Sequence, residues 1–326
     1  MTIRKLGDGI FVDESLNIDE KNPDAIIFDC DGVLIDITNS YDLTIKNTTA
    51  ILLKKIAAIE KSDPVTIEMI EGFKKTGGFN DEVDLTYALI LSYIAAKKLN
   101  KPASKFVFDV IENSNKTGIG SVEKYLESLV DLSDVRKRLD YPGSRSTNIL
   151  CSFFDQLFYG SELLYKLYKK KSQFDGKGLI ENDKVLLKKE LVDALRKKFS
   201  KKIGIVTGRG IESIRYSLKE LLNEFDLKNS VFLEDEPREL AKPNPASLLR
   251  AINGIGSRCT IFVGDSTEDL IMAKEAEQMG TMTIFCGIYG TSKHPEEKLR
   301  MFEEKKADMI LESIDLIPKA LNLEQQ

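Results

Sequence analysis

The hydrophobic pattern of the chain changes character twice. A short apolar run at residues 25–29 ends abruptly in polar residues, which predicts a buried parallel strand. From Ser40 to about residue 200, apolar positions keep helical spacing, with Gly/Ser/Pro-rich joints at 141–147 and 172–178. No strand of comparable quality is predicted there, so the middle of the chain is expected to be helical. Residues 1–23 are mixed and polar and allow one short strand.

Beyond residue 200, short apolar runs again alternate with helical segments. Strands are predicted at 202–206, 231–233, 260–263, 281–285 and 308–311. This βαβ rhythm predicts an α/β fold with a doubly wound parallel sheet, a Rossmann-like core. The helical stretch is then an insertion after the first strand. We expect a core domain of residues 1–37 and 200–326 and a helical cap domain of residues 38–199.

Composition excludes several classes of protein. The net charge is −5 and lysine is interleaved with acidic residues, so nucleic-acid binding is not expected. Four cysteines lie far apart without a C-x-x-C pair, which fits a reducing interior and disfavours a zinc site. No signal peptide and no run of apolar residues long enough to cross a membrane is recognised, so a cytoplasmic location is expected.

Two carboxylates stand at the end of the first predicted strand, where they are expected to face solvent. Asp29 and Asp31 share one side of the extended chain, while Cys30 points away and Gly32 permits a tight turn. Carboxylates this close repel each other unless a cation lies between them, and Mg²⁺ prefers such oxygen ligands. One aspartate can then attack phosphorus and the other can protonate the departing oxygen. The alternative is a strand end with two solvated acids.

Further polar residues follow the later strands, at the carboxyl ends where open α/β sheets bind ligands. Thr207 offers a hydroxyl and Gly208 an exposed N–H beside a predicted helix start, which suits a phosphate. Lys242 supplies a positive charge for phosphoryl oxygens. Asp265 can complete a Mg²⁺ site, and Asp269, one helical turn later, can orient a metal-bound water or Lys242. Taken singly, a plain turn and a surface lysine remain the alternatives.

Other catalytic arrangements find less support in the sequence. His294 is the only histidine and lies in a polar loop, so a Ser-His-Asp triad would depend on a surface residue. No G-x-S-x-G segment accompanies it. No complete G-x-x-x-x-G-K-[ST] or G-x-G-x-x-G motif occurs, so ATP or NAD sites of those types are not expected.

Four short segments together resemble the motifs of the haloacid dehalogenase superfamily. They are Asp29-x-Asp31-Gly-Val, Thr207-Gly-Arg, Lys242-Pro and Gly264-Asp265-x-x-x-Asp269. The resemblance covers residues 24–37 and 200–315. It implies that Asp29 is the nucleophile, that Asp31 is the acid and base, and that Thr207 and Lys242 hold the phosphoryl group. It also implies a Mg²⁺ site made by Asp29, the backbone carbonyl of Asp31, and Asp265, with Asp269 beside them.

The helical insertion resembles the C1-type cap of the phosphoglycolate phosphatase-like branch, although it is larger than usual. A Gly77-Gly78 loop corresponds to the specificity loop of that branch, which makes Lys75, Phe79 and Asn80 candidate substrate-binding residues. Asn80 is also expected to cap the next helix. An ordinary helix connection, or substrate reading by the loop 115–121, remains the alternative. Gly208 is expected to touch the substrate, and Arg209 either does so or pairs on the surface.

The resemblance favours phosphoester chemistry, because the dehalogenases of the superfamily lack the second carboxylate that Asp31 supplies here. The sequence therefore predicts a Mg²⁺-dependent phosphatase of a small phosphorylated metabolite, acting through an aspartyl phosphate. A phosphomutase of the β-phosphoglucomutase type is the nearest alternative, and a non-enzymatic phospho-ligand-binding protein is a third. A homodimer is allowed, but nothing in the sequence requires it.

Overall fold

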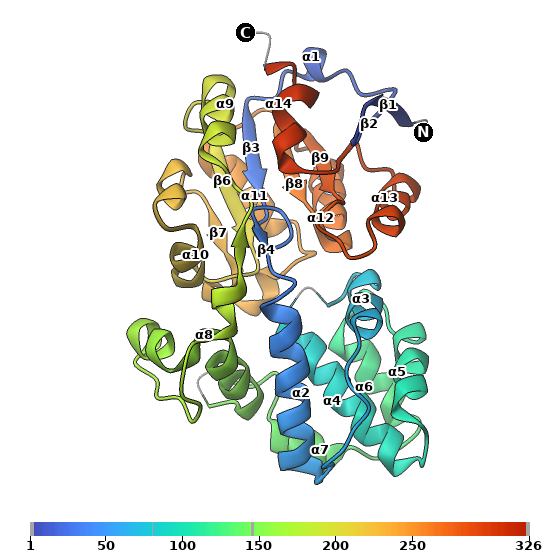
Figure 1. The fold of residues 1–326 in the computed structure, drawn as a ribbon. Coiled ribbons are helices and arrows are strands. Elements are labelled where there is room, and N and C mark those ends of the chain that lie inside the picture. The colour runs from blue at the N-terminus through green and yellow to red at the C-terminus, as the bar shows by residue number, and fades with distance from the viewer. Residues whose placement is uncertain (1–2, 80, 145–146, 324–326) are drawn as a thin grey trace. The chain divides into compact units, whose positions relative to one another are not determined.

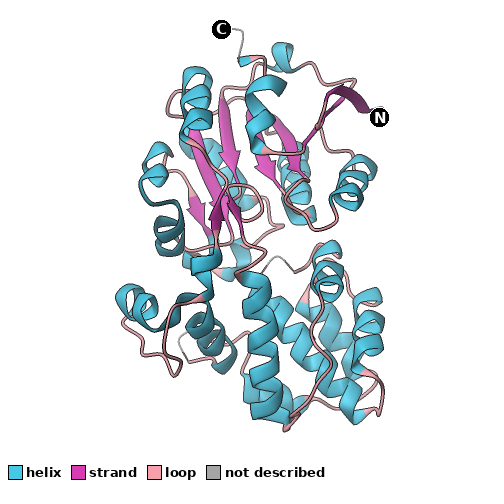
Figure 2. Cartoon of the chain, viewed as in Figure 1, coloured by secondary structure: helices cyan, strands magenta, loops and turns pink. Residues whose placement is uncertain are grey.

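The computed structural model describes residues 3–79, 81–144 and 147–323, and its contacts divide the chain into two compact units. Unit 1 contains residues 1–36 and 184–326, and unit 2 contains residues 37–183. Figure 1 traces both along the chain, and Figure 2 shows that strands gather in unit 1 while unit 2 is built of helices. The two units are described separately below.

Unit 1 is an α/β unit around an eight-stranded sheet of order β1-β2-β10-β9-β8-β3-β6-β7. Strands β3, β6, β7, β8, β9 and β10 are parallel to their neighbours in this set, which confirms the predicted parallel sheet. The strands are β1 (Ile3–Gly7), β2 (Ile10–Asp13), β3 (Ala25–Phe28), β6 (Ile203–Thr207), β7 (Val231–Phe232), β8 (Thr260–Gly264), β9 (Thr283–Ile288) and β10 (Met309–Leu311). Central strand β3 is buried at all of its residues, as its continuous apolar run requires.

From β3 the chain first moves outward to β6 and β7, and then returns to β8, β9 and β10 on the other side of β3. Because crossovers between parallel strands are right-handed, the helices of these two directions cover opposite faces of the sheet. Helices α9 and α10 connect strands toward β7, whereas α11 and α12 return across the sheet and pack against each other (Figure 1). The helices are α1 (Ile18–Lys21), α9 (Lys189–Phe199), α10 (Ile211–Leu218), α11 (Ala246–Ile255), α12 (Thr267–Gln278), α13 (Pro295–Glu304) and α14 (Ile317–Ala320). Short 3₁₀ segments are η2 (Lys219–Glu224), η3 (Leu233–Asp235), η4 (Arg238–Leu240) and η5 (Ile314–Leu316). The helical segment between β6 and β7 consists of α10 followed directly by η2.

The N-terminal segment contributes more to the sheet than the sequence predicted. Instead of one short strand, β1 and β2 form an antiparallel hairpin, and β2 pairs antiparallel with β10. Its turn includes Gly9, whose φ of 71° favours glycine. The hairpin extends the parallel sheet at one edge.

The boundary between the units agrees with the prediction at one end and differs at the other. The first lies after residue 36, one residue from the predicted position. The second lies after residue 183 and not after residue 199, because α9 packs against β6 and α14 of unit 1. Two short strands, β4 (Ile35–Asp36) and β5 (Lys184–Val185), pair antiparallel at this crossing. Strand β5 was not predicted, since two residues carry no hydrophobic period.

Unit 2 is all-helical among the regular elements of its described residues, as predicted. Its centre is α4 (Glu82–Lys98), which is buried around its whole circumference from Leu85 to Ala96. Helices α2, α5, α6 and α8 pack on it. The other elements are α2 (Tyr41–Ala57), α3 (Ile67–Lys75), α5 (Ala103–Glu112), α6 (Ile119–Glu127), α7 (Ser133–Leu139), α8 (Ile149–Tyr168) and η1 (Leu179–Asn182).

Helix α8 is broken at Gly160, where φ is 71° and ψ is 175°. The segment 176–178 crosses the break, so that a Cβ on Gly160 would lie 2.2 Å from the amide nitrogen of Gly178. A Cβ on Gly178 would in turn lie 2.1 Å from the carbonyl carbon of Tyr159. The amide of Ser161 donates to the carbonyl of Gly176, which satisfies a donor that the break exposes. Both glycines are therefore required by a backbone-to-backbone approach.

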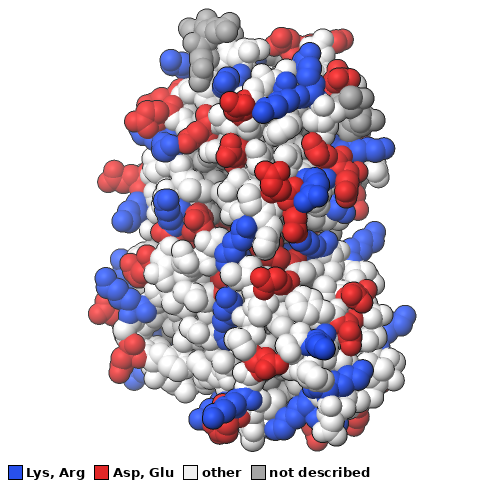
Figure 3. Space-filling model, turned by 45° about the vertical axis from the view of Figure 1, so that its right-hand side comes forward, with Lys and Arg blue, Asp and Glu red and all other residues white. Residues whose placement is uncertain are grey.

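Charged side chains of both signs are intermixed over the face shown in Figure 3, as the interleaved sequence indicated. Among the described residues, none of the helices combines the length and the apolar character that a membrane span needs.

Candidate active site

The predicted core residues follow strands whose carboxyl ends meet at one edge of the unit 1 sheet. Phe28 of β3 pairs in register with Ile205 of β6 on one side and with Val263 of β8 on the other. The residues after these positions therefore lie side by side. This register brings Asp29 and Asp31 next to Thr207 and Asp265, as the topology predicted.

The loop after β3 folds back on itself tightly. The carbonyl of Cys30 accepts the amides of Leu34 and Ile35, and the amide of Gly32 donates to the carbonyl of Ile35. Gly32 has a φ of 73°, and a Cβ there would lie 2.2 Å from Oδ2 of Asp265. Glycine is needed at this position both for the turn and for the close approach of the Asp265 carboxylate.

Lys242 joins two of the acids. Its Nζ lies 2.9 Å from Oδ1 of Asp29 and 2.6 Å from Oδ1 of Asp269, and its ammonium group is completely buried. Burial alone would lower the pKa of Lys242, but the two carboxylates outweigh it and raise the pKa above its usual range. Lys242 is thus a fixed positive charge beside Asp29, not the surface lysine of the alternative interpretation.

Asp269 is held in place from both of its oxygens. Oδ1 faces Lys242, while Oδ2 accepts the amides of Asp265 and Ser266 and the Ser266 hydroxyl at 2.7–3.2 Å. The Ser266 hydroxyl accepts the Asp269 amide in return, which completes a capping box at the start of α12. Of the two roles predicted for Asp269, this arrangement supports the orientation of Lys242.

Carboxylates gather at this edge closely enough to hold a metal ion. Asp29, Asp265 and Asp269 each offer an oxygen, and these atoms lie within 4.8 Å of one another. Asp29 is only 3% exposed, which corrects the expectation that it faces solvent. Burial raises the pKa of Asp29 to about 8, with Lys242 opposing this shift and the neighbouring aspartates adding to it. A divalent cation would relieve that conflict, so the residues fit a Mg²⁺ site in which Asp29 and Asp265 are the available side-chain ligands.

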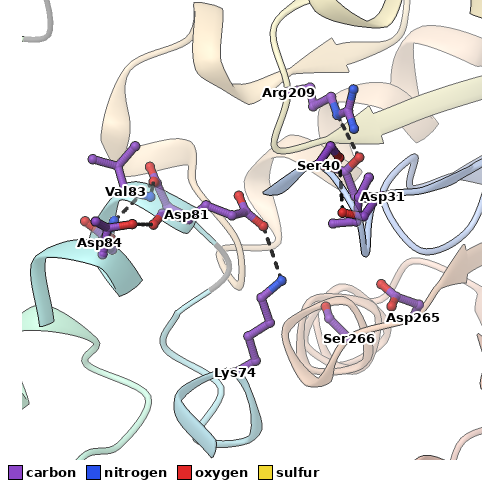
Figure 4. A network of polar contacts seen from close by, with 12 residues as sticks. Asp31, Ser40, Lys74, Asp81, Val83, Asp84, Arg209, Asp265 and Ser266 are labelled. Carbon is purple, nitrogen blue, oxygen red and sulfur yellow. Dashed lines mark hydrogen bonds and ion pairs between the residues drawn. The ribbon is translucent and has the colours of Figure 1, made fainter. Parts of the chain in front are cut away.

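Arg209 lies inside the site and not on the surface. Its side chain is 1% exposed, and its Nε donates to Oδ1 of Asp31 at 2.7 Å (Figure 4). Its Nη1 donates to the hydroxyl of Ser217 on α10 at 3.3 Å. Of the alternatives left open by the sequence, the surface pair is wrong, because the buried arginine pairs with the predicted acid and base.

Thr207 and Gly208 lie at the end of β6, where they were expected to bind phosphate. Thr207 is buried and Gly208 is exposed. The neighbouring helix start is already occupied, because Glu234 accepts the amide of Gly210 at 3.0 Å and Asp235 accepts that of Ile211 at 2.7 Å. These acids neutralise the positive end of α10. The expected contribution of that helix N-terminus to phosphate binding is therefore corrected.

Two residues of the site were missed in the sequence. Lys298 of α13 places its Nζ 2.5 Å from Oδ2 of Asp265, and the hydroxyl of Thr291 donates to the carbonyl of Gly32 at 2.7 Å. Both belong to the segment after β9, another strand that ends at this edge. Strand order alone could have drawn attention to that segment, but a lysine among 47 basic residues carries no signal of its own.

The candidate substrate residues of unit 2 have different environments. Lys75 is exposed, whereas Phe79 is completely buried with its ring centroid 4.9 Å from that of Phe73. Phe79 therefore has a packing role in place of the expected substrate contact. Asn80 lies outside the described residues. The cap of α4 is Asp81, whose carboxylate accepts the amides of Val83 and Asp84, and not the predicted Asn80 (Figure 4).

The loop at Gly77-Gly78 and the loop 115–121, which were proposed as alternative specificity sites, are in direct contact. A Cβ on Gly78 would lie 2.6 Å from the amide of Gly118, and a Cβ on Gly118 would lie 2.4 Å from the carbonyl of Gly78. The loops around 77–79 and 115–118 thus meet backbone to backbone. A substitution in one loop is expected to disturb the other.

The parallel sheet with motif residues from four segments at one edge defines a class of hydrolase. Residues 168–277 match the family model of haloacid dehalogenase-like hydrolases. A comparison with curated proteins gives no significant sequence match.

Solved structures with a similar fold include phosphatase Tt82 from Thermococcus thioreducens, at 22% identity and a TM-score of 0.55, covering 84% of this chain and 98% of that one. A predicted phosphoglycolate phosphatase from Haemophilus somnus is 15% identical, with a TM-score of 0.46 and coverage of 91% and 96%. A family IA, variant 3 hydrolase from Entamoeba histolytica is 15% identical, with a TM-score of 0.48 and coverage of 93% and 100%.

Proposed function

We propose that this protein is a Mg²⁺-dependent phosphatase of a small phosphorylated metabolite. The observation that carries the proposal is the buried Lys242, which links Asp29 to Asp269 within hydrogen-bonding distance while Asp265 lies in the same cluster. Phosphoryl transfer needs a nucleophile beside fixed positive charge, and this cluster supplies both. The similar fold of phosphatase Tt82 from Thermococcus thioreducens is in keeping with this function.

In the proposed mechanism, Asp29 attacks phosphorus in line and the leaving alkoxide takes a proton from Asp31. Lys242 balances negative charge on the transferring group, and Asp269 keeps the Lys242 ammonium directed at Asp29. Asp31 then accepts a proton from the water that hydrolyses the aspartyl phosphate. Mg²⁺, bound by Asp29, Asp265 and the Asp31 carbonyl that the resemblance implies, would neutralise charge on the nucleophile and the phosphoryl oxygens.

Arg209 supports Asp31 in this scheme and does not reach the substrate. Because the guanidinium bonds both Asp31 and Ser217, it fixes the carboxylate relative to α10. Thr207 and the exposed Gly208 remain candidates for binding the phosphoryl group at the end of β6. Unit 2 remains the proposed source of substrate selectivity.

The test is a screen of phosphorylated metabolites for phosphate release with purified protein in Mg²⁺. We expect turnover of a subset of phosphomonoesters that ceases in EDTA and returns with added Mg²⁺. Undiminished turnover in chelator would contradict the metal-dependent mechanism. Turnover of a sugar phosphate that requires a bisphosphate activator and releases little phosphate would indicate a mutase instead.

A further inference from the structure

A lysine lies against Asp265, one of the two side-chain ligands of the proposed metal site. Lys298 lies on α13, and its Nζ approaches Oδ2 of Asp265 to 2.5 Å. The two side chains are only 16% and 21% exposed. The same segment is tied to the catalytic loop by the hydrogen bond from Thr291 to the carbonyl of Gly32. Lys298 is therefore held at the site by a largely buried ion pair on an anchored segment, and is not a mobile surface lysine.

The charges of the cluster divide between two lysines. Lys242 lies between Asp29 and Asp269 and leaves Asp265 to another cation. Lys298 is that cation, so every acid of the three-carboxylate cluster has an ammonium group beside it. The protein thus carries its own positive charge at the place where a divalent ion would bind.

We infer that Lys298 is an internal counterion that competes with the divalent cation for Asp265 and so weakens metal binding, an inference that rests on the proposed function. A Mg²⁺ ion lies about 2.1 Å from its oxygen ligands. A metal and an ammonium on one carboxylate would then be only a few ångströms apart. Their repulsion at that separation corresponds to about a tenfold loss of affinity in a solvent-like dielectric.

An alternative role, in which Lys298 orients Asp265 for the metal, predicts the opposite effect. The ammonium is a compact point charge on a flexible stem and does not impose a carboxylate orientation as a planar fork does. Asp265 is already positioned by the backbone of the β8–α12 turn, where its own amide donates to Asp269. Loss of Lys298 should therefore strengthen metal binding and not weaken it.

The experiment is a Mn²⁺ titration of the full-length protein without substrate, followed by the electron paramagnetic resonance signal of free Mn²⁺. Lys298→Met is expected to bind Mn²⁺ about tenfold more tightly than the wild type. Lys298→Arg, which keeps the charge, should stay close to the wild-type affinity. Arg300→Met is the matched control, because it removes one positive charge from an exposed position on the same helix. Its affinity should not change.

A second measurement follows Lys298 directly. Acetylation of Lys298 by acetic anhydride, quantified by mass spectrometry, should rise several-fold on Mn²⁺ addition, while that of exposed Lys305 should not. Weaker or unchanged Mn²⁺ binding by Lys298→Met would overturn the inference alone, as would protection of Lys298 by the metal. If the folded wild type bound no Mn²⁺, the proposed function would fail and the inference with it.

Discussion

At the scale of single residues, Asp31 and Arg209 show how a buried arginine can fix the position of a carboxylate. The Arg209 guanidinium bridges Asp31 in the loop after β3 and Ser217 on α10, which lie far apart in the sequence. A fork with several donors can hold both partners, whereas a lysine would reach only one of them. The pair therefore makes a sharp prediction.

Arg209→Lys should lower kcat by about tenfold and Arg209→Met by up to about a hundredfold, with KM little changed, because outer residues of a site act through the groups they orient. The loss should be greater for alkyl phosphates than for p-nitrophenyl phosphate, since only the former need Asp31 as an acid. The measurement is kcat for both substrates in each variant. An equal loss for the two substrates would indicate that Arg209 does not act through Asp31.

Asp29→Asn should abolish turnover, by at least about a thousandfold in kcat, because an amide cannot form the phosphorylated intermediate. The fold should survive, since the amide is isosteric and Lys242 keeps Asp269 as its partner. Phosphate release and circular dichroism are the two measurements. Retention of a tenth of the wild-type kcat by the folded variant would exclude Asp29 as the nucleophile.

The residue types and their order along the chain were enough to predict the cluster around Asp29, because motif spacing places them at strand ends. They were not enough to locate the long basic side chains. Arg209 and Lys298 reach their partners through several rotatable bonds, and their destinations depend on where α10 and α13 come to lie. Phe79 was misjudged for a related reason, since a ring beside a glycine pair can face either the solvent or the core.

At the scale of elements, one carboxylate ties the start of β3 to the turn before β8. Asp24 accepts the Ser257 hydroxyl and the amides of Arg258 and Cys259 at 2.8–3.2 Å, and the Lys202 ammonium at 2.8 Å. Burial acts to raise the pKa of Asp24, but these donors outweigh it and hold the pKa well below its usual range. Asp24 therefore stabilises the register of the central strands.

Asp24→Asn should lower the free energy of unfolding by about 2 kcal/mol at neutral pH, because it removes hydrogen bonds to a charged acceptor. A carboxyl whose pKa is depressed by folding stabilises the protein above its unfolded pKa, 3.8, and loses this contribution as the pH falls. Urea unfolding of both proteins at pH 7 and pH 3 should thus show a difference that shrinks with acidity. A difference that is constant with pH would rule out the charge as its origin.

Periodicity predicted the long elements well and their ends poorly. The parallel strands and the main helices were recognised because each shows several turns or alternations of apolar residues. Only one short strand was expected in place of the hairpin β1–β2, because three of the five residues of β1 are exposed and the strand has no clear apolar alternation. The cap of α4 is Asp81 and not the predicted Asn80, and the acids of η3 that accept the first amides of α10 were missed, because capping depends on local geometry that a residue type only permits.

At the scale of the whole molecule, the chain crosses between its units where two strands are paired. Asp36 of β4 is the direct antiparallel partner of Lys184 of β5. In unit 2, the side chains of Asn182 and Ser40 bond to the carbonyl of Asn39 and to Asp183. In each unit, the two segments at which the chain enters and leaves are therefore joined by hydrogen bonds within that unit. The hydrophobic pattern alone could not reveal these contacts.

Replacing residues 37–183 with Asn-Gly should convert β4 and β5 into a hairpin and leave unit 1 folded, because this turn fits paired antiparallel strands. The short protein should melt cooperatively, bind Mn²⁺ and hydrolyse p-nitrophenyl phosphate, but lose its preference among metabolites. The same deletion carrying Asp29→Asn is the inactive control. Aggregation of the short protein would show that unit 1 depends on unit 2 for its stability.

The close backbone contact between Gly160 and Gly178 makes residues 161–177 a loop whose two ends are held together, and this loop is called the clasp below. Its outer part carries Lys169, Lys170 and Lys171, of which Lys169 and Lys171 are exposed. A trypsin cut there would open the clasp at its tip while the bond from Ser161 to Gly176 still joined its two sides. The nicked protein should then remain a single folded particle, and the same tip would accept an inserted tag or fluorophore.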